Sequence, residues 1–175
     1  MKKVKMICMA ALIMAVGTVN AAAPFGGEAD VKYAKQLWTS MVNESYAGED
    51  AIMSRPYTGQ HPHGAILDTI SGPINIDGKL HHIIIKRNYG GPGVSRDAVA
   101  NDPAKYLKAV TVMLKRPGYD PETQDWFWVK YKADGSLDTN PAGMMLAGKI
   151  AKGKPKGCIA CHSAAPGGDM MYLTN

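Results

Sequence analysis

Two cysteines and a histidine near the C-terminal end of the chain have the spacing that covalent haem attachment requires. Cys158 and Cys161 are three residues apart, and His162 follows at once, in the motif CIACH. Thiols at this spacing can add to the two vinyl groups of one haem, and the adjacent histidine then lies beneath the iron as an axial ligand. With this composition, a chance match is roughly a one-in-a-thousand event. The motif therefore predicts one covalently attached haem c.

Two other kinds of site use cysteines at this spacing, a redox-active dithiol and one half of a zinc site. A dithiol has no need of His162, and a zinc site needs a second Cys/His pair at ligand spacing, which the sequence lacks. The third cysteine, Cys8, lies in a segment that we expect to be removed, so no disulfide framework remains. Both observations favour haem.

The N-terminus has the parts of a secretory signal peptide. Lysines precede an apolar stretch over 6–16, and small residues follow up to Ala21. The apolar stretch is too short to span a bilayer, and no later run approaches the ~20 apolar residues of a membrane helix. We predict a signal peptide over 1–21, export to the periplasm or beyond, and no membrane span.

Charge and length limit the class of protein. Loss of the three signal lysines lowers the formal net charge from +5 to +2, with 17 basic and 15 acidic residues. This nearly balanced charge gives no indication of nucleic-acid binding. The 154 residues after Ala21 suffice for one domain with a hydrophobic core. We expect a flexible lead-in over 22–28 and a single haem domain over 29–175.

Short apolar runs separated by Gly/Pro turns predict an α+β fold. Such meanders favour antiparallel pairing, so we expect a mostly antiparallel β-sheet with flanking helices and the haem near the C-terminus. Alternation along 126–131 places the two tryptophans on one strand face and Phe127, Val129 and Tyr131 on the other. We predict helices over 30–45 (capped by Asp30), 103–107, 143–151 and the haem motif, and strands over 65–70 (ended by Gly72-Pro73), 82–86, 110–115 and 126–131.

The position of the motif in the chain excludes some cytochrome types. Only 13 residues follow His162, which excludes the small cytochromes that use a methionine ligand far downstream. Met170 and Met171 are too close to reach the opposite haem face, so we expect them to be packing or tail residues. The strand-like Val, Ile and Trp runs contradict a four-helix bundle.

Six blocks of sequence carry a resemblance to a known family. They are PHG at 62–64, IIIKRNY at 83–89, VMLKRPGY at 112–119, DWFWVKY at 125–131, GCIACHS at 157–163 and DMMY at 169–172. In order and spacing the chain resembles the cytochrome P-460 family, which includes the cytochromes called c-prime-beta. The resemblance extends from about Trp38 to Leu173 and is more specific than the haem motif alone.

The resemblance implies a homodimer whose five-coordinate haem has one face open to small ligands, with His162 as the sole protein ligand. Catalytic members oxidise hydroxylamine, pass electrons to a partner and have a haem cross-linked to a lysine; c-prime-beta members bind nitric oxide without turnover. The resemblance thus implies a haem protein that binds small nitrogenous ligands, and an enzymatic activity stays an open alternative.

Lys86 matches the position of the cross-linked lysine, because it follows three isoleucines near the end of a strand. Strand alternation puts Lys86 on the same face as Ile84 and His82, so it can point inward. The alternative is a strand-end lysine with its ammonium in water. Arg87 follows where the enzymes tend to have an acidic residue, so both interpretations stay open.

Hydroxylamine oxidation also needs a proton acceptor near the iron. Residues 149–157 contain four lysines and no carboxylate, although known enzymes use a carboxylate in this neighbourhood. We take His61, His63 and His82 as candidates for the distal pocket; each is otherwise an ordinary loop or solvated histidine. A histidine there would act as a base or fill the sixth iron position, and the latter gives a periplasmic electron carrier.

Overall fold

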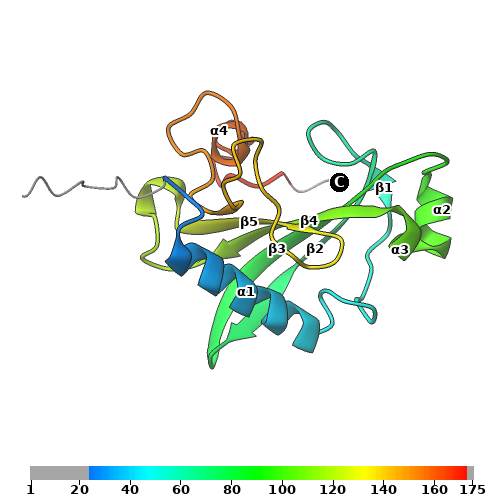
Figure 1. The fold of residues 1–175 in the computed structure, drawn as a ribbon, viewed down its shortest axis with the longest axis horizontal. Coiled ribbons are helices and arrows are strands. Elements are labelled where there is room, and N and C mark those ends of the chain that lie inside the picture. The colour runs from blue at the N-terminus through cyan, green and yellow to red at the C-terminus, as the bar shows by residue number, and fades with distance from the viewer. Residues whose placement is uncertain (1–23, 173–175) are drawn as a thin grey trace, which may run out of the picture.

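Six strands follow one another in chain order, and each pairs with its sequence neighbour in an antiparallel sheet (Figure 1). The computed structural model describes residues 24–172. The strands are β1 (Tyr57–Thr58), β2 (Ile66–Ile76), β3 (Lys79–Tyr89), β4 (Leu107–Lys115), β5 (Trp126–Lys132) and β6 (Ala147–Gly148). The helices are α1 (Glu28–Asn43), α2 (Arg96–Asn101), α3 (Pro103–Tyr106) and α4 (Cys158–His162), with a 3-10 turn, η1 (Pro121–Thr123). The expected α+β fold with an antiparallel sheet is confirmed.

One face of the sheet is covered by α1. Leu37 and Met41 of this helix lie in a hydrophobic core with buried side chains of β2 to β5. Tyr131 anchors the helix, because its buried hydroxyl donates to the carbonyl oxygen of Ala34 at 2.6 Å. The predicted alternation along β5 is confirmed, since Phe127, Val129 and Tyr131 all belong to this core.

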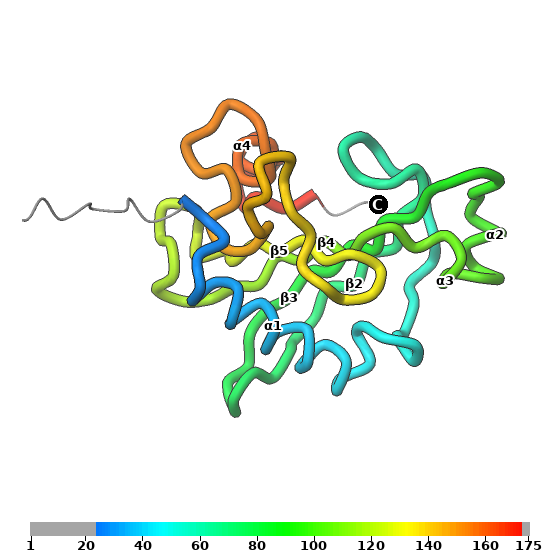
Figure 2. Tube along the Cα trace, in the orientation of Figure 1, coloured from blue at the N-terminus to red at the C-terminus, as the bar shows by residue number. Residues whose placement is uncertain are grey.

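The opposite face is covered by the C-terminal segment. Trp126 and Trp128 lie there in a second core with Ile84, Ile159 and Met170. Figure 2 shows α4 and the loop between β1 and β2 rising on the side of the sheet that α1 does not cover. The sheet therefore supports a structural core on one face and leaves the other to the haem motif.

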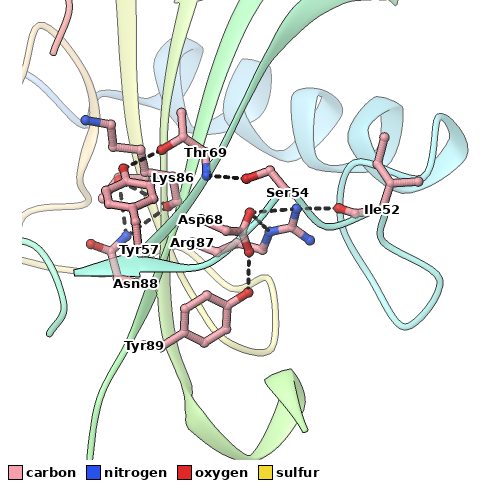
Figure 3. A network of polar contacts seen from close by, with 10 residues as sticks. Ile52, Ser54, Tyr57, Asp68, Thr69, Lys86, Arg87, Asn88 and Tyr89 are labelled. Atoms are coloured by element: carbon pink, nitrogen blue, oxygen red, sulfur yellow. Dashed lines mark hydrogen bonds and ion pairs between the residues drawn. The ribbon is translucent and has the colours of Figure 1, made fainter. Parts of the chain in front are cut away.

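Buried polar residues tie the segment before β1 to the sheet (Figure 3). The fully buried Asp68 carboxylate accepts from Arg87 Nε at 3.2 Å and Nη2 at 3.1 Å, and from the Tyr89 hydroxyl at 2.6 Å. Arg87 also donates to the carbonyl of Ile52, and Ser54 Oγ accepts from the amide of β2 residue 69. Burial raises the pKa of Asp68, against the effect of Arg87 and Tyr89. This network holds residues 52–54 at the start of the loop that leads to His61 and His63.

The boundaries of two predicted elements are wrong. β2 does not end at Gly72-Pro73 but continues to Ile76, with Pro73 opposite His82. β1 pairs only with the first two residues of β2, so Pro73 lies in an edge portion where no ladder bond from its nitrogen is needed. Helix α1 begins at Glu28 after Gly27, and Asp30 accepts a bond from the hydroxyl of residue 119 instead of capping it.

The helix predicted over 143–151 is also wrong, because this segment contains β6 and turns. Gly143 and Gly148 have φ values of +78° and +94°, which a helix does not accommodate. Gly148 approaches α1 so closely that a Cβ would lie 2.1 Å from Asp30 Oδ2, so no other residue fits. The helices predicted near 103–107 and at the haem motif are confirmed as α3 and α4.

The N-terminal predictions are only partly within the described residues. The signal peptide over 1–21 lies outside them. The segment over 22–28 was expected to be a flexible lead-in, but its described part packs on the domain. Phe25 is buried in the second core, and the amide of Gly26 donates to the carbonyl of Ala147 at 2.8 Å. Within 24–172, no helix has the length and apolarity needed to cross a membrane.

Candidate functional site

A cavity of about 990 Å³ lies between the sheet, α4 and the loop that joins β1 to β2. Cofactor and ligand pockets typically have volumes of about 300–1,000 Å³, so this cavity is at the upper end of the range. Cys158, Cys161 and His162 line it, together with Lys86, His61 and His63. The fold thus brings the haem motif and most of the predicted site residues to one place.

Helix α4 places both cysteines on the cavity wall. Residues three apart share one helix face, so Cys158 and Cys161 point to the same side. Cys158 is half-buried, Cys161 is exposed, and both are free thiols. The chain enters α4 through Gly157, whose φ is +132°, and a Cβ there would lie 2.4 Å from the Cβ of Ala151. Burial raises the pKa of the Cys158 thiol, so it is neutral near pH 7.

His162 presents an unprotonated ring nitrogen. Its Nδ1 lies 2.7 Å from the carbonyl oxygen of Met170. A carbonyl only accepts, so Nδ1 carries the proton and Nε2 keeps a lone pair, as in most metal-binding histidines. Burial lowers the pKa of His162, which keeps the ring neutral near pH 7. Met170 is buried and Met171 packs against the same core, which confirms their predicted packing role.

His63 is held by a side chain that sequence reasoning missed, Asn88 of β3. His63 Nδ1 lies 3.0 Å from Asn88 Oδ1, which also accepts from the amide of Gly64 at 3.2 Å. The Asn88 amide nitrogen donates to the carbonyl of Lys86 at 2.9 Å, so its oxygen must face His63. His63 therefore donates from Nδ1 and has a free lone pair on Nε2. Burial lowers its pKa, as it does for His162.

The other histidines are placed differently. His61 lines the cavity but is exposed. His82, which we predicted in the distal pocket, does not line the cavity: its Nε2 lies 3.3 Å from Ser71 Oγ, and its ring is 6.0 Å from that of Trp126. His81 Nδ1 lies 2.9 Å from the carbonyl of Lys115. The structure thus brings His61 and His63 to the cavity and leaves His81 and His82 outside it.

Lys86 points into the cavity wall, as strand alternation predicts. Ile84 and Lys86 both line the cavity, whereas Ile83 and Ile85 lie in the core under α1. Lys86 is only 8% exposed, so the alternative of a solvated strand-end lysine is wrong. Its Nζ donates to the carbonyl oxygen of Tyr172 at 2.6 Å. Burial lowers the pKa of Lys86, which increases the share of the neutral, nucleophilic amine.

One residue of the cavity wall, Trp128, has a buried indole nitrogen without a hydrogen-bond partner in the described chain. Trp128 lines the cavity, with its ring centroid 4.8 Å from that of His162. Its Nε1 is buried and has no hydrogen-bond partner among the described residues. A buried indole N–H normally finds an acceptor. The cavity, the two thiols and the free His162 Nε2 together fit a haem.

Comparisons of the chain with protein-family models, with curated proteins and with solved structures found no match. What bears on function is therefore the site itself.

Proposed function

We propose that this chain is an exported monohaem c-type cytochrome of the P-460 type, which binds small nitrogenous molecules such as nitric oxide or hydroxylamine. One haem c would occupy the cavity, with thioether bonds from Cys158 and Cys161 and with His162 as an axial ligand. The observation that carries the proposal is that α4 sets all three motif residues on the wall of one cavity of about 990 Å³, with His162 Nε2 unprotonated.

Each motif residue has a separate role in this proposal. Each thiol adds across one haem vinyl group, so the prosthetic group cannot dissociate. The Met170 carbonyl orients His162 and increases the basicity of its Nε2, as outer-shell acceptors do at metal sites. The haem supplies an iron that binds small ligands and exchanges electrons. The apolar side chains of the second core limit the access of water to this face of the sheet.

Nitric oxide binding tests the proposed activity. We expect the reduced holoprotein to bind one nitric oxide per haem and to change its Soret absorption accordingly, because haem iron binds small ligands of this kind. Absorption titration under anaerobic conditions measures this. A spectrum unchanged at saturating nitric oxide and hydroxylamine would contradict the proposed ligand class.

Lys86 separates an enzyme from a gas-binding protein. If the protein oxidises hydroxylamine as catalytic P-460 cytochromes do, we expect peptide mass spectrometry to find Lys86 on the same haem-bearing species as Cys158 and Cys161. Lys86→Ala should then restore an ordinary c-type spectrum. Lys130→Ala is the matched control, because Lys130 also lines the cavity but pairs with Asp138 at 2.8 Å. If the peptide that contains Lys86 is recovered from the holoprotein without haem attached, the enzymatic activity would be contradicted and gas binding favoured.

Electron transfer is a second candidate function, favoured by one observation. His63 and His162 both line the cavity, with ring centroids 6.4 Å apart and ring planes at 84°. A c-type haem with two histidine ligands transfers electrons without binding a substrate. In either function, a soluble electron-transfer partner and a homodimer are part of the proposal.

A further inference from the structure

The distance between His63 and His162 matches that of two ligands on one iron. A metal–histidine bond is about 2.0 Å long and each ring nitrogen lies about 1.1 Å from its ring centre, so two such ligands have centroids about 6.2 Å apart. A histidine that only hydrogen-bonds an iron-bound molecule lies roughly 2 Å farther away. The observed separation is 6.4 Å, with the ring planes at 84°. The separation of the two rings is therefore the one expected when both histidines bind the same iron.

Both rings are also in the tautomer that coordination requires. His162 donates from Nδ1 to the Met170 carbonyl, and His63 donates from Nδ1 to Asn88 Oδ1. The orientation of Asn88 is set independently, because its amide nitrogen lies within bonding distance of the Lys86 and Ala109 carbonyls. Metal-binding histidines almost always use their second nitrogen in this way. Each Nε2 therefore has its lone pair free.

Hydrogen bonds hold the loop that carries His63 at several points, so the position of the His63 ring is well defined. The amide of Gly59 donates to the carbonyl oxygen of Ala65 at 2.8 Å, and the amide of His63 donates to the carbonyl oxygen of Gln60 at 2.9 Å. The amide of Gly64 donates to Asn88 Oδ1. His61, on the same loop, is exposed and has no such contact to β3 in the described chain. The structure thus distinguishes two neighbouring histidines that the sequence leaves equivalent.

We propose that His63 is the second axial ligand of the haem iron in the resting protein. The proposal rests on the proposed function, since it requires a haem in the cavity. It replaces the five-coordinate iron that the family resemblance implies with a six-coordinate, low-spin iron. Nitric oxide or hydroxylamine then binds only after His63 leaves the iron, so this histidine controls access to the site.

Electron paramagnetic resonance and absorption spectra of the ferric holoprotein near neutral pH test the proposal. We expect a low-spin spectrum for the unaltered protein and for His61→Ala, and a high-spin spectrum for His63→Gly. Added imidazole should restore the low-spin spectrum of His63→Gly. Nitric oxide should bind to the reduced His63→Gly protein at least about tenfold more tightly, because no internal ligand competes for the iron.

A variant that replaces His63 by another iron ligand distinguishes loss of coordination from loss of the fold. His63→Met should stay low-spin and raise the reduction potential, since a methionine ligand favours the reduced iron. The proposal is overturned if the unaltered holoprotein is high-spin, if His63→Gly stays low-spin, or if His61→Ala alone loses the low-spin signal. In these cases covalent haem is present and the proposed function stands. Absence of covalent haem from the unaltered protein would instead overturn the proposed function, and this proposal with it.

Discussion

Replacement of both motif cysteines, Cys158→Ala with Cys161→Ala, is expected to leave the protein without thioether-bound haem. Each thiol supplies one covalent bond, and without them the haem is held only by His162 and by contacts in the cavity. Acid acetone should then extract the haem, and denaturing gels should lose haem staining. Each single variant should give less holoprotein, with the remaining haem partly extractable.

A bond between Lys86 and the haem would retain haem in the double variant, so the test must also remove this lysine. The double variant is therefore also made with Lys86→Ala, and all haem should then be extractable. Ser163→Ala is the matched control: Ser163 follows the motif, and its hydroxyl donates to the Ile159 carbonyl at 2.7 Å, within its own helical turn. Haem that resists extraction from the triple variant would contradict covalent attachment through the motif.

Asp68→Ala is expected to lower the free energy of unfolding by about 3–5 kcal/mol, the cost of removing one partner of a buried ion pair. The change leaves the buried Arg87 side chain, which is only 6% exposed, without its carboxylate partner. It also deprives the buried Tyr89 hydroxyl of its acceptor. Urea denaturation of the holoproteins, followed by circular dichroism, measures the difference.

An exposed ion pair provides the comparison. Glu122 lies 2.8 Å from Lys152, and the Glu122 side chain is 81% exposed. Glu122→Gln should change the free energy of unfolding by less than about 1 kcal/mol, because water screens such pairs. If Asp68→Ala cost no more than Glu122→Gln, the network of Asp68, Arg87 and Tyr89 would not be a major source of stability.

Elements with clear local patterns could be predicted from the sequence. The strands after Asp77-Gly78 and around Trp126 alternate or are continuously apolar, and their turns are marked by glycine and proline. The alternation also placed Lys86 on the inner face of β3, because side-chain direction in a strand is a local property. The helix at the motif, α4, was also predicted.

Elements that depend on distant contacts could not be predicted. Pro73 continues β2 only because β1 is too short to pair with it, and β6 exists because β5 offers a partner for Ala147 and Gly148. Helix α2 was missed although Ser95 marks its start, with Ser95 Oγ accepting from the amide of Ala98 at 3.1 Å. That serine cap was a usable local signal.

The candidate site also combines residues that a local pattern identifies with residues that only distant contacts bring into place. Cys158, Cys161 and His162 are adjacent in sequence, so their spacing is sufficient to find them. The sequence could not distinguish His63 from His82, because the choice depends on where the β1–β2 loop folds over the sheet. Asn88 lay within a recognised block and on the same strand face as Lys86, but only the structure shows that its amide holds His63.

The mass of the unaltered protein tests the central claim most directly. The protein would be exported from a bacterial host that has haem-attachment machinery and then analysed intact under denaturing conditions. We predict the mass of residues 22–175 plus one haem, with the haem on the peptide that contains Cys158 and Cys161. A mass equal to that of the polypeptide alone, in a host that matures a control c-type cytochrome, would contradict the account.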